Sequence, residues 1–154
     1  MNIVTVFMLF LSSCMAQEKT IELEIPDNFS GWGFLVTTSA RKKIVKNSGR
    51  YVLNNNGVSY IDTVTFNNSS RIEFYRNDRI LTEKDIKFFF SEDRSVGTEN
   101  SSNIRTLYMF YILDSIELKK GDDYWRDENN RRPLRQKLYK QKDSLIGNRI
   151  LIIE

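Results

Sequence analysis

The sequence contains no histidine and only one cysteine, Cys14. Without histidine the chain has no Ser-His-Asp or Cys-His nucleophilic centre, none of the usual zinc sites, and no side chain that titrates near neutrality unless its surroundings shift its pKa. A disulfide within the chain is excluded because it needs two cysteines. The sequence also has no glycine-rich phosphate loop and no D-x-D-x-D-G calcium loop. We therefore predict no catalytic residue, no cofactor and no metal ion.

Because histidine and cysteine are excluded, carboxylates are the remaining candidates for acid–base chemistry. Glu92-Asp93 and Asp122-Asp123 are adjacent pairs, and two neighbouring carboxylates can act as acid and base. Both pairs lie in polar stretches typical of turns, where acidic side chains are normally solvated. We expect that the protein is not an enzyme. A small envelope enzyme that uses such carboxylates is the alternative.

The overall composition favours one β-rich domain. The chain has 154 residues, of which 40% are apolar and 28% are charged, a balance typical of globular proteins. It contains ten Phe, seven Tyr and two Trp, and aromatic residues are enriched in strands. We predict a mainly β fold, a single antiparallel β-sandwich-like domain over residues 20–154 with one C-terminal helix.

The N-terminal residues are typical of an export signal. The apolar run from Ile3 to Phe10 is too short to cross a bilayer, which takes roughly 20 residues, but it suits the apolar part of a signal peptide. Leu11-Ser12-Ser13-Cys14 follows at once and resembles the lipobox of bacterial lipoproteins. In that motif the cysteine receives lipid and becomes the first mature residue. Residues 1–13 are then the signal peptide, and residues 14–19 link the lipid to the domain.

The lipobox predicts a protein held at the membrane of the cell envelope by acyl chains such as palmitate on Cys14. Cleavage after Ala16 is the alternative, because Cys14 and Ala16 also fit the small positions of an A-x-A-like site. It would release a secreted or periplasmic protein. A third interpretation is a buried N-terminal segment with an incidental thiol.

Alternating and β-branched segments predict the strands of the domain. They cover residues 20–25, 32–38, 51–53, 57–61, 71–75, 86–90 and 104–113. We expect the core to contain Leu23, Trp32, Leu35, Ile61, Phe74, Phe89, Tyr108 and Phe110. The segment 54–57 should form the turn of a hairpin, because Asn-Gly tolerates positive φ. The polar residues 91–103 are predicted to be a long loop.

Residues 119–149 form a basic, partly helical tail with ten basic and five acidic residues. Pro133 suits the first turn of a helix, and Leu134 and Leu138 lie on one face, so we predict a helix over residues 133–143. The positive charge can face an anionic membrane surface or simply water. Nucleic acid is not expected as a partner of an exported protein.

Large aromatic residues beside charges are the candidate contacts with a ligand or partner. Trp32 and the cluster Tyr124-Trp125-Arg126 could stack on a sugar ring or dock a protein. The alternative is structural, because large aromatic side chains are mostly buried. In that case Trp32 anchors the core and Trp125 packs the tail onto the sheet.

The segments Ile25-Pro26-Asp27-Asn28-Phe29-Ser30-Gly31-Trp32, Gly49-Arg50-Tyr51 and Gly57-Val58 resemble the opening of a family of exported bacterial proteins. That family shares an Ile-Pro-x-x-Phe/Tyr-x-Gly-Trp start, a Gly-x-Tyr strand and a Gly-Val hairpin. The similarity covers residues 25–61 and implies an exported, β-rich domain. It brings no activity and no site residues.

These features together predict a lipid-anchored cell-envelope protein that binds or scaffolds a partner. The expected partners are the membrane, through the lipid on Cys14, and an envelope protein or glycan. The alternatives are the small envelope enzyme and a soluble secreted binding protein.

Overall fold

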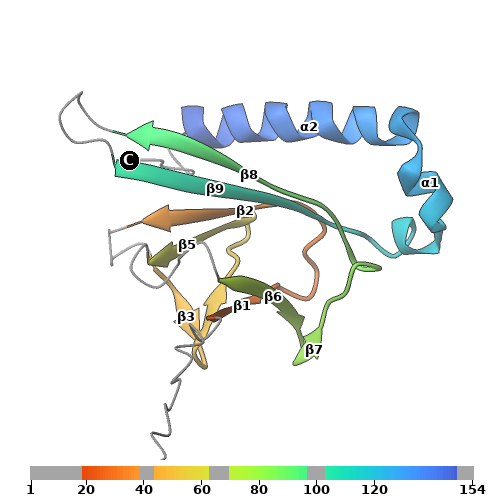
Figure 1. Ribbon diagram of the computed structural model, residues 1–154. Helices are drawn as coiled ribbons and strands as arrows, with labels where there is room; N and C mark the ends of the chain where they lie inside the picture. The colour runs from red at the N-terminus through yellow and green to blue at the C-terminus, as the bar shows by residue number, and fades with distance from the viewer. Residues whose placement is uncertain (1–18, 39–43, 63–69, 97–102, 149–154) are drawn as a thin grey trace, which may run out of the picture.

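The structure, a computed structural model, describes residues 19–38, 44–62, 70–96 and 103–148. The side chains of Phe89 and of residues 93–96 and 103–105 are outside this description. Two β-sheets pack on one another, and a long C-terminal helix covers the outer face of one of them (Figure 1). The mainly β fold with a C-terminal helix is therefore confirmed. The predicted signal peptide and Cys14 lie outside the described residues.

The five-stranded sheet has the order β3-β4-β1-β6-β7, and the four-stranded sheet has the order β5-β2-β9-β8. Two helices, α1 and α2, follow the strands, after a short 3-10 turn, η2. The bounds are β1 Thr20–Glu24, β2 Gly31–Thr38, β3 Lys46–Asn47, β4 Arg50–Val52, β5 Val58–Asp62, β6 Arg71–Arg76, β7 Arg79–Ile80, β8 Ile86–Val96, β9 Asn103–Ile112, η2 Glu117–Lys119, α1 Asp122–Arg126 and α2 Glu128–Gly147.

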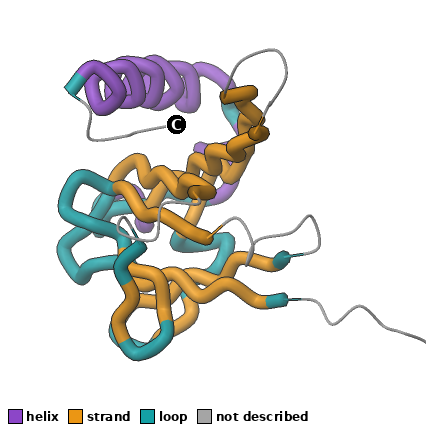
Figure 2. The backbone as a smooth tube through the Cα atoms, turned by 90° about the vertical axis from the view of Figure 1, so that its left-hand side faces the viewer, coloured by secondary structure: helices purple, strands orange, loops and turns teal. Residues whose placement is uncertain are grey.

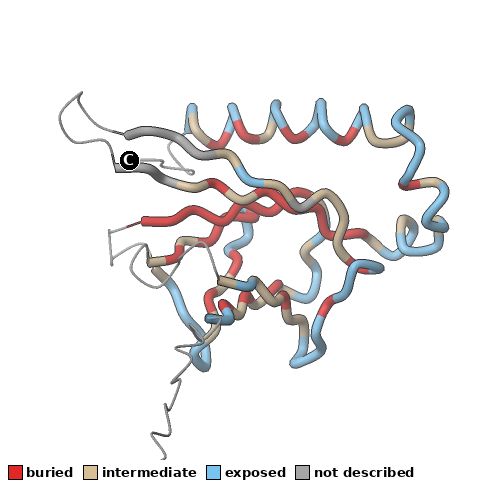
Figure 3. Tube along the Cα trace, viewed as in Figure 1, coloured by how far each residue is buried: buried red, intermediate tan, exposed pale blue. Residues whose placement is uncertain are grey.

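Three layers enclose two hydrophobic cores, with the four-stranded sheet in the middle (Figure 2). Side chains alternate along a strand, so Phe34 and Val36 of β2 face the helix while Leu35 faces the other sheet. On β9, Met109 faces the helix and Phe110 the sheet. Because β2 is covered on both faces, it is buried from its second residue to its last (Figure 3).

Most of the predicted core is confirmed. Leu23, Trp32, Leu35, Ile61, Phe74 and Phe110 are buried. Tyr108 is partly buried against the core between the sheets. The side chain of Phe89 lies outside the described residues. Period-2 alternation therefore identifies the buried positions well, because a strand that buries one face must place every second residue there.

The strand pairing differs from a purely antiparallel sandwich, because both sheets are mixed. β1 pairs in parallel with β4 and with β6, and β2 pairs in parallel with β5. The antiparallel pairs are β2 with β9, β8 with β9, β3 with β4, and β6 with β7. Alternation of side chains is the same in both kinds of pair, so the sequence pattern did not distinguish them.

The predicted hairpin at residues 54–57 is wrong in its strands but correct in its turn. Gly57 has a φ of 75°, as an Asn-Gly turn requires. The turn, however, leads from β4 in one sheet to β5 in the other. The hairpin turns of the five-stranded sheet are Ser48-Gly49 and Asn77-Asp78, all four with positive φ. Two consecutive positive φ angles are typical of a type I′ turn.

The C-terminal helix is longer than predicted, and the predicted loop at residues 91–103, between β8 and β9, is shorter. Helix α2 begins at Glu128 because the side chain of Asp127 accepts a hydrogen bond from the N–H of Asn129 at 2.9 Å. Pro133 therefore lies inside the helix and not in its first turn. Strands β8 and β9 extend to Val96 and from Asn103, so the predicted loop 91–103 is largely strand at its start. Residues 97–102 lie outside the described part.

Candidate ligand site

Trp32 is a structural residue at the centre of the core under helix α2. Its side chain is 2% exposed, and its Nε1–H donates a hydrogen bond to the carbonyl oxygen of Leu134 at 2.9 Å. Its ring packs against Phe90 and Tyr111, with ring centroids 5.8 and 5.1 Å away. Trp32 therefore fixes the helix to the sheet and offers no face to a ligand.

Trp125 is also buried, at 6% exposed, and it meets Trp32 through Phe88, whose ring lies 6.0 Å from both. Phe88 reaches this position through a β-bulge, where the pairing with β9 shifts between Lys87 and Phe90 and Phe88 takes a φ of 57°. The structure thus joins the two tryptophans inside the core.

Of the two other predicted contact residues, Tyr124 packs against Trp125 with ring centroids 5.0 Å apart, and Arg126 lies outside the cluster. Tyr124 is partly buried, and the ammonium group of Lys120 lies 4.3 Å from the centre of its ring. Arg126 points to solvent, with an ion pair to Asp123 at 3.4 Å. The burial agrees with the structural alternative, in which Trp32 anchors the core and Trp125 packs the tail onto the sheet.

The two carboxylate pairs considered for acid–base chemistry take part in ion pairs. The carboxylate of Glu92 lies 2.9 Å from the ammonium group of the buried Lys142 and ties β8 to α2. Asp122 pairs with Lys87 at 3.3 Å. Asp122 and Asp123 belong to α1 and not to a turn, and the side chain of Asp93 is outside the described residues.

Two buried groups with shifted pKa values, Asp85 and Tyr111, both serve the fold. Burial raises the pKa of Asp85, but hydrogen bonds from the N–H of Thr82 and from Arg79, each 2.9 Å long, outweigh it and leave the pKa lowered. Burial also raises the pKa of Tyr111, and the hydrogen bond from its hydroxyl to Glu117 raises it further. Neither shift moves the group toward neutrality, so neither is suited to proton transfer at neutral pH.

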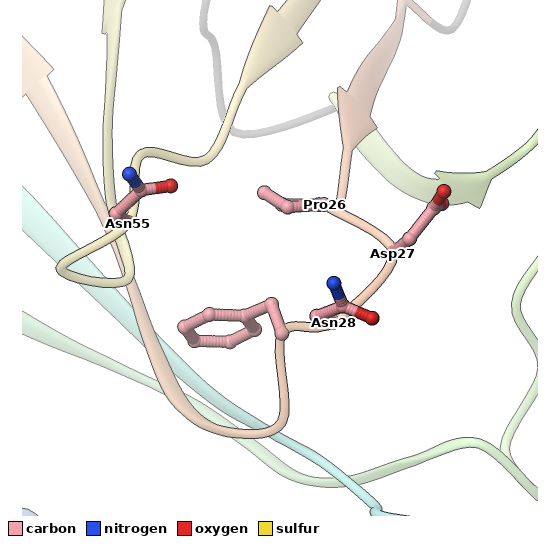
Figure 4. A pocket seen from close by; sticks show the side chains of 5 residues that line it. Pro26, Asp27, Asn28 and Asn55 are labelled. Atoms are coloured by element: carbon pink, nitrogen blue, oxygen red, sulfur yellow. The ribbon is translucent and has the colours of Figure 1, made fainter.

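A hollow of about 240 Å³ opens between two loops, and Pro26, Asp27, Asn28, Phe29 and Asn55 line it. The first loop follows β1 and turns back on itself, because the N–H of Phe29 donates to the carbonyl oxygen of Pro26 at 3.0 Å. Figure 4 shows Asn55, on the second loop, across from Pro26 and Asn28 on the first.

The second loop is held in shape by its own first residue. The side-chain oxygen of Asn54 accepts hydrogen bonds from the N–H groups of Asn56 at 2.9 Å and Val58 at 3.0 Å, as asparagine commonly does in turns. Asn55, between these fixed points, stays exposed at the rim of the hollow.

The two loops touch at Gly57, which only glycine can occupy without strain. A Cβ atom there would lie 2.7 Å from the carbonyl oxygen of Trp32 and 2.9 Å from the ring of Phe29. The carbonyl oxygen of Gly57 also accepts a hydrogen bond from the N–H of Phe34 at 2.7 Å. The hollow is therefore a preformed feature between two rigid loops.

The hollow combines polar groups with apolar surface. The side chains of Asp27, Asn28 and Asn55 form no hydrogen bond or ion pair with another described residue. Each amide can donate and accept, and the carboxylate accepts. Pro26 and Phe29 add an apolar wall. At about 240 Å³ the hollow is smaller than the roughly 300–1,000 Å³ of drug-sized sites, so it suits a single small ring.

The sequence alone does not identify this hollow. Segment 25–32 carries the family resemblance and residues 54–57 predict a turn, but the candidate contact in these segments is Trp32. The available signal was the abundance of Asp and Asn in both loops. That signal is weak, because the same residue types are favoured in turns with no ligand.

Within the described ranges, no group of three or more histidine, cysteine, aspartate or glutamate side chains could hold a metal ion. Nor does any helix in the described part of the chain have the length and apolar character needed to span a membrane.

No family model and no curated protein matches the sequence. Among solved structures, the chain resembles a candidate lipoprotein from Bacillus anthracis. The similarity covers 82% of this chain and 95% of that chain, with 13% sequence identity and a TM-score of 0.45. At that identity and TM-score the likeness does not extend to function.

Proposed function

We propose that this protein is a lipid-anchored binding module of the cell envelope, and that it holds a hydroxyl-rich ligand, of the kind found in envelope glycans, in the hollow between residues 26–29 and Asn55. The hollow carries the proposal, because three polar side chains with no hydrogen-bond partner among the described residues line it beside an apolar wall. A sugar ring matches that arrangement. Its hydroxyl groups both donate and accept hydrogen bonds, and its C–H faces pack on apolar side chains.

Membrane attachment through Cys14 is the second part of the proposal, and the lipobox supports it. The Cys14→Ser variant should move from the membrane fraction to the soluble fraction or stay unprocessed, because stable anchoring depends on the acyl chains. Cell fractionation and the N-terminal sequence of the mature protein measure this. Equal partitioning of wild type and variant, with both mature chains beginning at Gln17, would show that cleavage follows Ala16.

Binding at the hollow is tested with small sugars as probes. The double variant Asn28→Ala/Asn55→Ala should bind the tightest of glucose, galactose and N-acetylglucosamine about tenfold more weakly, because two hydrogen bonds of about 0.5–1.5 kcal/mol each are lost. Titration calorimetry or amide NMR shifts measure the change.

Asn129→Ala is the matched control, because Asn129 is an exposed asparagine on α2, away from the hollow. It should bind the sugar as the wild type does. Absence of binding by the wild type to all three sugars, or the same loss in the control, would contradict the proposal. The fractionation result would stand either way.

A further inference from the structure

A second hollow, of about 270 Å³, lies at the start of β1. Lys19 and the first residues of β1, Thr20 to Glu22, line one side of it, and Lys46, Ser48, Gly49 and Tyr51 of the β3–β4 hairpin line the other. β1 and β4 run in parallel, and for that reason the hairpin turn before β4 lies beside the first residues of β1. The hollow is thus fixed by the pairing of the sheet.

Positive charge exceeds negative charge among the residues that line the hollow. Among the described residues neither Lys19 nor Lys46 forms an ion pair, and both are exposed. The ammonium group of Lys46 lies 4.1 Å from the centre of the Tyr51 ring, which holds it at the wall. The carboxylate of Glu22 is engaged by Arg50 at 2.9 Å. The lining thus includes two ammonium groups together with the polar residues Thr20 and Ser48, a set that suits a phosphate group.

The same edge carries a third basic side chain. Arg71 of β6 is the partner of Thr20 in the sheet, and its N–H donates to the carbonyl oxygen of Lys19 at 3.0 Å. Its side chain is 66% exposed, with Glu73 at 3.4 Å. This edge is therefore basic on both sides of β1.

This edge is also the part of the domain nearest to the lipid site in the chain. Met15 to Lys19 are five residues, and at about 3.3–3.6 Å per residue they span at most roughly 20 Å. A lipid on Cys14 therefore keeps Lys19 within that distance of the head groups.

We infer that the hollow at Lys19 and Lys46 binds the phosphate of an anionic phospholipid head group, so that the domain rests on its membrane by the N-terminal edge of β1. This inference deepens the proposed function and rests on its lipid anchor. It also fixes the orientation of the domain relative to the bilayer. The hollow at residues 26–29 begins just beyond the other end of β1, so it faces away from the bilayer and toward ligands of the envelope.

The structure separates this surface from the basic helix, the surface that the sequence offers for contact with the membrane. Helix α2 lies on the far side of the four-stranded sheet from β1 and β3 (Figures 1 and 2). Lys142 is buried against Glu92, and Arg131 and Arg135 both pair with Glu128. The exposed lysines Lys137 and Lys140 of α2 remain as a matched comparison.

Vesicle flotation tests the inference with the chain that begins at Met15. This chain lacks the lipid but keeps every described residue. It should bind vesicles of phosphatidylcholine mixed with phosphatidylglycerol at low ionic strength and not phosphatidylcholine alone. The Lys19→Gln/Lys46→Gln variant should bind about 30-fold more weakly, since each lysine at an anionic surface contributes about 1 kcal/mol. Lys137→Gln/Lys140→Gln, with the same change of net charge, should stay within about twofold of wild type.

The inference is wrong if the wild type does not bind anionic vesicles, if both lysine pairs lose binding equally, or if the helix pair shows the larger loss. Titration with inorganic phosphate alone, followed by the amide NMR signals of Ser48 and Gly49, separates the head group from a soluble anion. Saturation by free phosphate as tight as binding to vesicles would assign the hollow to that anion. Failure of the lipid anchor itself is read separately, from the fractionation of Cys14→Ser.

Discussion

Replacing Trp32 by alanine should lower the free energy of unfolding by about 3–5 kcal/mol, the usual loss for a buried aromatic side chain. Trp32 lies between β2 and α2, where its ring packs on three aromatic neighbours. Its removal leaves a cavity under the helix and deletes the hydrogen bond to Leu134. Urea unfolding followed by far-ultraviolet circular dichroism measures the change.

A pair of conservative variants separates packing from hydrogen bonding in this effect. Trp32→Phe removes some ring area and the 2.9 Å hydrogen bond to Leu134. Trp125→Phe removes the same atoms at another buried position, where Nε1 has no partner among the described residues. Trp32→Phe should therefore be the more destabilising by about 1 kcal/mol. Equal losses, or a greater loss at Trp125, would mean that the hydrogen bond does not hold the helix.

The sequence predicted the buried residues better than the partners of each strand. Alternation depends only on which face of a strand is buried, so Leu23 and Phe74 were identified correctly. Pairing depends on which strands lie side by side, and Leu23 is flanked in parallel by Tyr51 and Phe74 from distant segments. The Asn-Gly signal fixes a local φ angle at Gly57, but that angle is compatible with a turn between two sheets as well as with a hairpin.

The sequence pattern could not predict the candidate ligand site either, because it does not tell which strands lie side by side. The loop of Phe29 and the loop of Asn55 meet because β2 and β5 pair in parallel, with Phe34 opposite Val58. That register places Gly57 against Trp32 and Phe29. Each loop alone contains only residues that favour turns. Their shared hollow exists only once the parallel pair is known.

Replacing Gly33 by alanine should destabilise the protein by about 3 kcal/mol, the upper part of the usual range for overpacking a core. Gly33 lies directly opposite Phe110 on the neighbouring strand. The ring of Phe110 covers the glycine and packs edge-on against Phe74 at 4.7 Å. A Cβ atom at residue 33 would overlap that ring. Phe110 is fully buried, so its ring cannot move aside into solvent.

The size of residue 110 decides whether this explanation is correct. Leucine lacks the ring atoms that a Cβ at residue 33 would meet, so Gly33→Ala should be at least 1 kcal/mol less destabilising in a Phe110→Leu background than in the wild type. Gly147→Ala is the control, because no atom of the described residues lies within 4 Å of a Cβ at that position. At the end of α2 alanine should be neutral or stabilising by up to about 1 kcal/mol. Chemical denaturation of the four chains of the cycle measures the coupling. If the effects of the two substitutions are additive, overlap with the Phe110 ring is not the reason that Gly33→Ala destabilises the protein.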